Sequence, residues 1–128
     1  MLSLPFHLPR KTRFQVYLPL LAWGFFIFFL SSQPSLPSPS VVIWDFAFKK
    51  LAHMFVYFVF FRLMFRAVQF DVTNQFKATA IALLLSIIYS MSDELHQSFI
   101  PGRTPTGKDV LFDILGMGIA WLTIFKYV

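Results

Sequence analysis

Many of the residues that could exchange protons or bind a phosphate lie in three short stretches of this sequence. They are Lys49, Lys50, His53 and Tyr57 in the first stretch, Asp93, Glu94 and Gln97 in the second, and Arg103, Asp109 and Asp113 in the third. Histidine and carboxylates are the usual general acids and bases, and arginine binds phosphate through a planar pair of donors. These residue types predict proton transfer or ion pairing at a phosphate-bearing group.

The spacing of these residues indicates helices. Lys49, His53 and Tyr57 recur every four residues and share one helical face, with Lys50 one residue off it. Asp93 and Gln97 follow the same rule. In the third stretch, Asp109, Asp113 and Gly116 lie one turn apart on one face, and Gly116 and Gly118 would let a neighbouring helix approach closely.

The composition shows what surrounds these helices. Of 128 residues, 57% are hydrophobic and only 13% charged, and 18 are phenylalanine. A chain this short has too little interior to bury so much apolar surface, which argues against a water-soluble globule, and it is too apolar to stay disordered. Cysteine is absent, which excludes disulfides, thiolate metal sites and cysteine nucleophiles.

Four apolar segments, separated by loops rich in proline, glycine and polar residues, predict an all-α integral membrane bundle. They cover about 14–30, 46–68, 76–97 and 109–127. A helix of roughly 20 residues spans a bilayer, so four of them leave no room for a soluble domain. We expect one membrane domain, residues 1–128, with four transmembrane helices.

The net charge of +5 predicts an orientation. Lysine and arginine favour cytoplasmic flanks. Seven such residues fall on the side of the termini and four on the other, so both termini are expected to be cytoplasmic, and no nucleic acid is expected as a partner. Five of the six acidic residues then fall at the outer ends of the segments. Charge inside a bilayer is costly, so these side chains should turn inward and pair or line a cavity.

The stretch from Ser92 to Gly116, SDELHQSFIPGRTPTGKDVLFDILG, resembles the signature of the VanZ-like membrane proteins. That signature reads roughly D-E-x-x-Q, then P-G-R, then D-x-x-x-D/N-x-x-G. Upstream, FKKLAHMFVY resembles the family's basic-Lys-x-x-His-x-x-x-Tyr stretch, and Ser31-Ser32-Gln33 also fits. Val56 departs from the pattern, because many members have glutamate there.

The resemblance implies a bacterial plasma-membrane protein, and it suggests chemistry on a lipid head group or a lipid-linked cell-wall precursor. The family is named for a protein associated with teicoplanin resistance. On this hypothesis the catalytic residues are His53, Asp93, Glu94 and Asp113, with His53 or Glu94 as the acid or base. The substrate-binding residues would be Lys50, Tyr57, Gln97, Arg103 and Asp109, with Lys50 and Arg103 on the phosphate.

Two other hypotheses stay open. The same residues could hold a lipid or a lipoglycopeptide without chemistry, or they could pair with one another and only fasten the helices together. A metal site built from His53, Asp93, Glu94, His96 and Asp109 can be drawn, but no tight ligand motif such as H-E-x-x-H occurs. We therefore predict neither a metal nor a cofactor, and the sequence does not predict an oligomeric state.

Overall fold

A computed structural model describes residues 11–34, 39–104 and 106–126, and these residues form four helices and no strand. The helices are α1 (Arg13–Ser31), α2 (Val42–Asp71), α3 (Gln75–Ser98) and α4 (Gly107–Phe125). The predicted all-α fold is confirmed for this part of the chain.

Local sequence signals explain where the helices begin. Thr12 caps α1 in a capping box with Gln15, and the Asn74 side chain accepts from the Lys77 backbone at the start of α3. Between α3 and α4 the chain turns at Gly102, whose φ of 85° favours glycine.

The helix α2 is longer than the sequence predicted, by four residues at its start and three at its end. The apolar run predicted a start near Phe46, but a charged residue such as Asp45 does not stop a helix. Asp45 and Lys49 form an ion pair one turn apart (2.9 Å), which supports the added first turn. Its 30 residues extend about 45 Å, more than the roughly 30 Å of a bilayer core, so its ends reach beyond that core unless it is strongly tilted.

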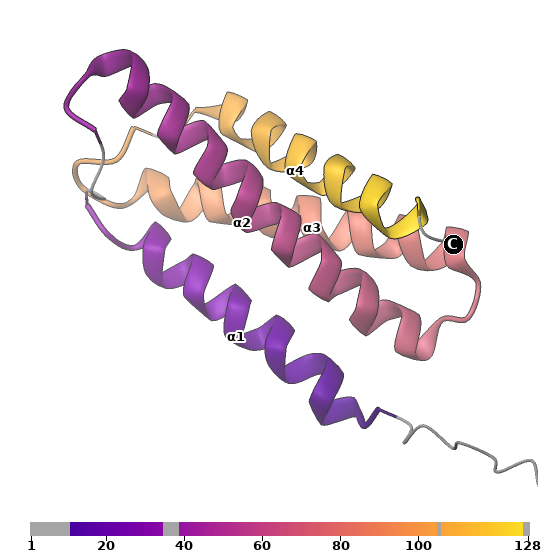
Figure 1. Ribbon diagram of the computed structural model, residues 1–128. Helices are drawn as coiled ribbons and strands as arrows, with labels where there is room; N and C mark the ends of the chain where they lie inside the picture. Colours follow the sequence, from indigo (N-terminus) through magenta and orange to yellow (C-terminus); the bar gives the residue numbers. More distant parts are fainter. Residues whose placement is uncertain (1–10, 35–38, 105, 127–128) are drawn as a thin grey trace, which may run out of the picture.

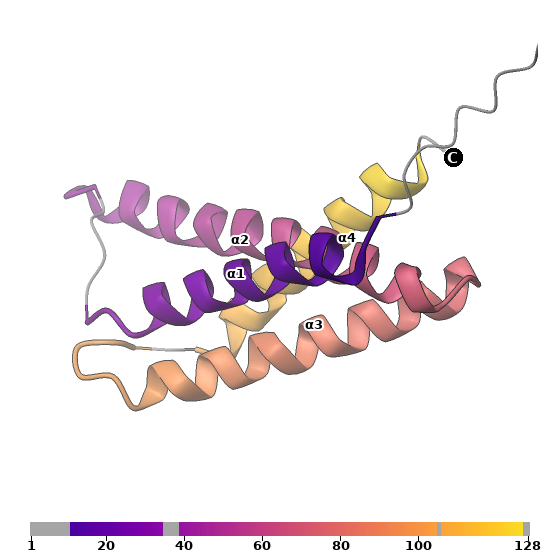
Figure 2. The same ribbon diagram turned by 90° about the horizontal axis from the view of Figure 1, so that it is seen from below.

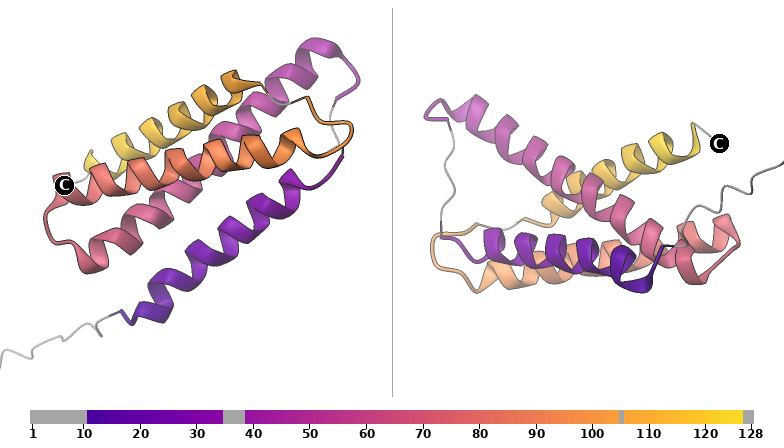
Figure 3. Two further views of the ribbon diagram at one scale, coloured as in Figure 1. Left: turned by 180° about the vertical axis from the view of Figure 1, so that it is seen from behind. Right: turned by 60° about the horizontal axis from the view of Figure 1, so that its bottom comes forward.

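The four helices form an up-and-down bundle (Figure 1). The end of α1, the start of α2, the end of α3 and the start of α4 lie together at one end, which we call the loop end. The short turn between α2 and α3 lies at the other end, as do the first residues of α1 and the last of α4. The helix α2 contacts each of the other three, and Figures 2 and 3 show it crossing α4 while α1 runs beside α3.

The crossing of α2 and α4 depends on one glycine. A Cβ atom on Gly116 would overlap the backbone carbonyl of Met54, so the two helices touch backbone to backbone. The prediction of close approach is therefore confirmed for Gly116. It is wrong for Gly118, where a Cβ would meet no atom within 4 Å.

Three helices, α1, α2 and α3, are long and apolar enough to cross a membrane. The fourth is not, because Lys108, Asp109 and Asp113 place three charges in its 19 residues. Large apolar side chains are exposed on all four helices, as Phe25 (76%) and Phe76 (87%) illustrate. Such a surface is unfavourable in water and fits a lipid environment. The chain therefore has the features of an integral membrane protein.

Candidate functional site

The most deeply buried charged group among the described residues is the carboxylate of Asp113, on the second turn of α4. Its side chain is 1% exposed. One oxygen lies 2.8 Å from Nδ1 of His53 on α2, and the other accepts from the Ser90 hydroxyl on α3 at 2.6 Å. Asp113 thus joins three helices and fixes the His53 ring. Because Nδ1 faces this carboxylate, Nε2 is the nitrogen left for chemistry.

A second carboxylate, that of Asp93 on α3, joins α3 to α2. Tyr57 on α2 donates to its Oδ2 at 3.0 Å, and Gln97, one turn along α3, donates to the same oxygen at 3.4 Å. Tyr57 and Gln97 are buried, at 1% and 6% exposure. Three of the predicted site residues, Tyr57, Asp93 and Gln97, therefore lie in contact.

The two neighbouring lysines of α2 behave differently. Lys50 forms a mostly buried ion pair with Asp109 at the start of α4, and its ammonium group also lies 5.3 Å from the ring centres of Phe46 and Phe112. Lys49 lies outside the cluster, on the exposed side, where it pairs with Asp45. The predicted face is therefore wrong in one detail: Lys50, and not Lys49, shares the inner face with His53 and Tyr57.

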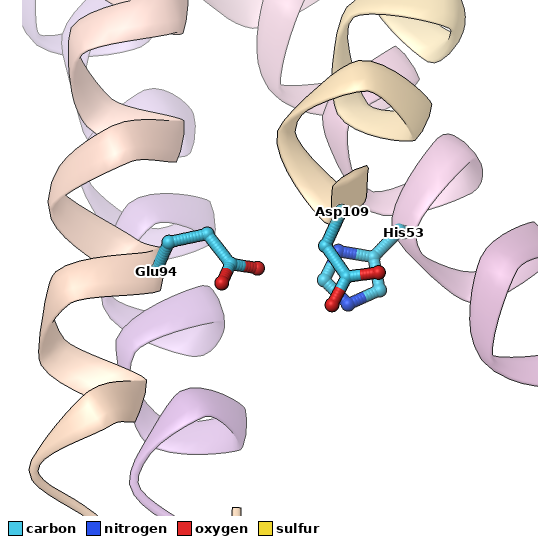
Figure 4. Close-up of side chains that lie close together, drawn as sticks. All are labelled: His53, Glu94 and Asp109. Carbon is cyan, nitrogen blue, oxygen red and sulfur yellow. The ribbon is translucent and has the colours of Figure 1, made fainter. Parts of the chain in front are cut away.

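Glu94 on α3 reaches toward His53 and Asp109 (Figure 4). Ligand atoms of these three residues all lie within 4.8 Å of one another, although they come from three different helices. The Glu94 oxygen Oε1 is buried and has no hydrogen-bond partner among the described residues. A buried unpaired carboxylate oxygen is costly, so it needs an explanation.

We refer to these residues together as the polar cluster: Lys50, His53, Tyr57, Ser90, Asp93, Glu94, Gln97, Asp109 and Asp113. Beside it lies a cavity of about 70 Å³ between α1, α2 and α3. Its polar wall comes from Ser31, His53, Tyr57, Asp93, Gln97 and Arg103, and apolar residues of α1 and α2 supply the rest. A cavity of this size holds a few waters or the polar tip of a larger ligand.

Arg103 lines the cavity but is also tied to α1. Its Nε donates to the Gln33 carbonyl at 2.7 Å and its Nη2 to the Leu30 carbonyl at 2.6 Å. These bonds give the Gln33 carbonyl, just after α1, a donor, and they add a second donor to the Leu30 carbonyl, which also accepts from the Gln33 backbone N–H at 3.2 Å. They use two of the five N–H donors of the guanidinium, so Arg103 fastens α1 and still has donors for a ligand.

Three contributors to the site were missing from the predicted set of site residues: the Ser90 hydroxyl and the carbonyls of Leu30 and Gln33. Ser90 lies on the same helical stripe as Asp93, and that spacing was the available signal. The carbonyls of Leu30 and Gln33 could not have been found, because a backbone acceptor has no sequence signature. His96, which the sequence allowed in a conceivable metal site, lies outside the cluster: it stacks on Phe28 and its Nε2 lies 2.9 Å from the Ser32 hydroxyl.

Comparison with known proteins adds a family assignment to this geometry. The family model VanZ/LLP1 matches residues 14–127, which is nearly the whole chain. The chain belongs to the VanZ/LLP1 family. Searches of curated proteins and of solved structures found no match.

The match to VanZ/LLP1 confirms the resemblance that the sequence motifs indicated. The residues that carried the resemblance converge at the loop end, since Asp93, Gln97, Asp109 and Asp113 all belong to the polar cluster. At Val56, where the VanZ-like pattern often has glutamate, the backbone carbonyl accepts from the Trp23 indole at 2.9 Å.

Proposed function

We propose that this VanZ-like membrane protein binds the head group of a lipid or a lipid-linked cell-wall precursor at the polar cluster, and acts on it. The observation that carries the proposal is the convergence of ionisable side chains from α2, α3 and α4 beside a cavity, in a chain that is only 13% charged. Ionisable residues within membrane helices are costly and commonly mark functional sites.

The roles follow from the positions of the side chains. Lys50 and Arg103 are the cations nearest the cavity and the cluster, and both suit a phosphate. His53, oriented by Asp113 and Ser90, and Glu94, with its unpartnered oxygen, are the groups that would exchange protons with the head group. Asp93, Tyr57, Gln97 and Asp109 would hold the neighbouring helices and the head group in position.

The placement in the membrane is part of the proposal. We propose that α4 also spans the bacterial plasma membrane, because Asp109 and Asp113 are buried while Leu111, Leu115 and Leu122 face outward. Charges that turn into the bundle oppose insertion less than charges that face lipid. With both termini cytoplasmic, the polar cluster would lie at the outer head-group level, within reach of a lipid phosphate.

A second candidate function is binding without chemistry. The specific observation in its favour is that each carboxylate of the cluster except Glu94 already has a side-chain partner: Lys50 for Asp109, Tyr57 for Asp93 and His53 for Asp113. Groups paired in this way are held in place and suit recognition of a polar ligand.

The two functions can be separated with purified full-length protein in lipid nanodiscs. Native mass spectrometry identifies the lipid that co-purifies, and the same lipid, with phosphatidylglycerol and undecaprenyl diphosphate as defined probes, is then followed for conversion. We expect His53→Asn to lower conversion by about 10²–10⁴-fold while lipid remains bound. His96→Asn is the matched control, because this histidine lies at the same end but outside the cluster.

Binding of lipid with no conversion of any probe by the unaltered protein would favour the second function. Absence of co-purified lipid beyond the amount in an unrelated membrane protein would reject both. Equal losses in His53→Asn and His96→Asn would show that the effect is structural.

A further inference from the structure

We infer that His53, Glu94 and Asp109 form a binding site for one divalent transition-metal ion, with Zn²⁺ the expected ion. Imidazole and carboxylate donors together suit first-row divalent metals, and two carboxylates balance the charge of the ion. The inference goes beyond the proposed function and is tested without lipid. The sequence allowed a set of five ligands that included these three, but no metal was predicted because no tight ligand motif occurs; the fold brings together His53, Glu94 and Asp109 from that set.

The distances are compatible with an ion after a small adjustment. The three ligand atoms lie within 4.8 Å of one another. Around a tetrahedral zinc ion with bonds of about 2.1 Å they would be about 3.4 Å apart, so the ligands must close by at most about 1.4 Å. The side chain of Glu94 is flexible and already points toward the other two residues (Figure 4).

The surroundings of His53 match those of a metal-bound histidine. A ligating imidazole almost always gives its second ring nitrogen to a carboxylate or a carbonyl, which fixes the ring and its tautomer. Asp113 takes that place on Nδ1 of His53 at 2.8 Å and is held in turn by Ser90 at 2.6 Å. This arrangement leaves Nε2 for the ion.

The unpaired oxygen of Glu94 is an independent indication. Oε1 is buried and has no hydrogen-bond partner within the described part of the chain. Buried carboxylates are normally hydrogen-bonded, ion-paired or bound to a metal. An ion between Glu94, His53 and Asp109 would give this oxygen a partner.

Lys50 is the group that opposes a cation here, because it is paired with Asp109. A metal would have to share Asp109 with it or displace it. A displaced ammonium group would still have favourable contacts, since it already lies over the rings of Phe46 and Phe112. Because Lys50 and the metal compete for Asp109, removal of the lysine charge should tighten metal binding, whereas removal of a ligand should weaken it.

The metal content is measured on tag-free, full-length protein in detergent, first stripped with chelator and then titrated with Zn²⁺ and with Mn²⁺ against a competing chelator. We expect one equivalent of Zn²⁺, bound more tightly than Mn²⁺. Glu94→Gln and Asp109→Asn should each weaken binding at least tenfold, and Asp113→Asn, which acts through His53, by about 10–100-fold. Lys50→Met should tighten binding by about tenfold, because a competing positive charge is removed.

His96→Asn is again the matched control and should bind Zn²⁺ like the unaltered protein. Glu94→Gln replaces an unpartnered oxygen, so its folding, followed by size exclusion and circular dichroism, should be unchanged. Less than one bound equivalent in the unaltered protein, or equal affinities in the unaltered protein and Glu94→Gln, would overturn the inference. Such a result would leave the proposed lipid function standing, because lipid binding is measured separately.

Discussion

At the scale of single residues, Asp113 decides how the loop end is built. A carboxylate with 1% exposure is strongly unfavourable unless both of its oxygens are satisfied. His53 satisfies one and Ser90 the other. The same two contacts that stabilise the buried carboxylate also orient the imidazole ring, so stability and function are coupled at this residue.

Two serines of α3 provide a matched test of this coupling. Ser90 and Ser86 are one turn apart and both are fully buried, but only the Ser90 hydroxyl has a hydrogen-bond partner among the described residues. Ser90→Ala should lower the free energy of unfolding by about 1–3 kcal/mol, because it leaves an Asp113 oxygen without its donor. Ser86→Ala should cause no loss, since it removes an unpaired hydroxyl. Unfolding in a denaturing-detergent titration measures both, and equal effects would contradict the role given to Ser90.

At the scale of helices, the contact between α2 and α4 positions the cluster. Gly116 allows the backbones to touch at Met54, the residue that follows His53. Asp113 lies one turn before Gly116 on α4, so the close approach brings the carboxylate within 2.8 Å of the imidazole. A larger separation of these helices would break that bond.

The two glycines of α4 test this packing. Gly116→Ala should lower the free energy of unfolding by about 1–3 kcal/mol, because the added methyl group would overlap the Met54 carbonyl. Gly118→Ala faces open space and should leave stability unchanged or slightly higher, since alanine favours helix. Both values come from the same unfolding titration. If Gly118→Ala lowered the free energy of unfolding as much as Gly116→Ala, the loss would come from placing alanine in this helix and not from the contact with Met54.

At the scale of the whole molecule, the two ends of the bundle have different chemistry. The loop end carries the polar cluster, whereas the opposite end holds a more exposed set in which Asp71 binds Arg13 at 3.0 Å and Tyr17 at 2.5 Å. The basic residues Arg62 and Arg66 also lie toward that end, on Thr123 and the Gln15 carbonyl. In the predicted orientation, which follows the preference of lysine and arginine for cytoplasmic flanks, this second end would face the cytoplasm.

The orientation can be measured with single cysteines, because the chain has none of its own. Ser40→Cys and Thr104→Cys, exposed at the loop end, should react with a membrane-impermeant maleimide in intact cells. Thr73→Cys, exposed in the turn between α2 and α3, should react only after the cells are opened. The reverse pattern would place the polar cluster at the cytoplasmic face, and labelling of all three in intact cells would contradict a spanning bundle.

The sequence by itself determined the class of the protein and most of its helices. Apolar runs and proline-rich breaks are local features, so α1, α3 and α4 were predicted to within about two residues. The VanZ-like motif and the regular spacing of Asp93, Gln97, Asp109 and Asp113 also identified the loop end as the place where polar residues gather.

Only the tertiary structure decided which of these groups touch. The spacing of residues along a helix shows which side chains share a face only to within about one residue. That spacing alone therefore could not show that Lys50, and not Lys49, lies on the inner face with His53. The partnership of His53 with Asp113, the triangle of His53, Glu94 and Asp109, and the use of Arg103 at the end of α1 depend on how far apart the helix axes lie. That distance is set by backbone contact at Gly116, a property of two helices together that neither segment contains alone.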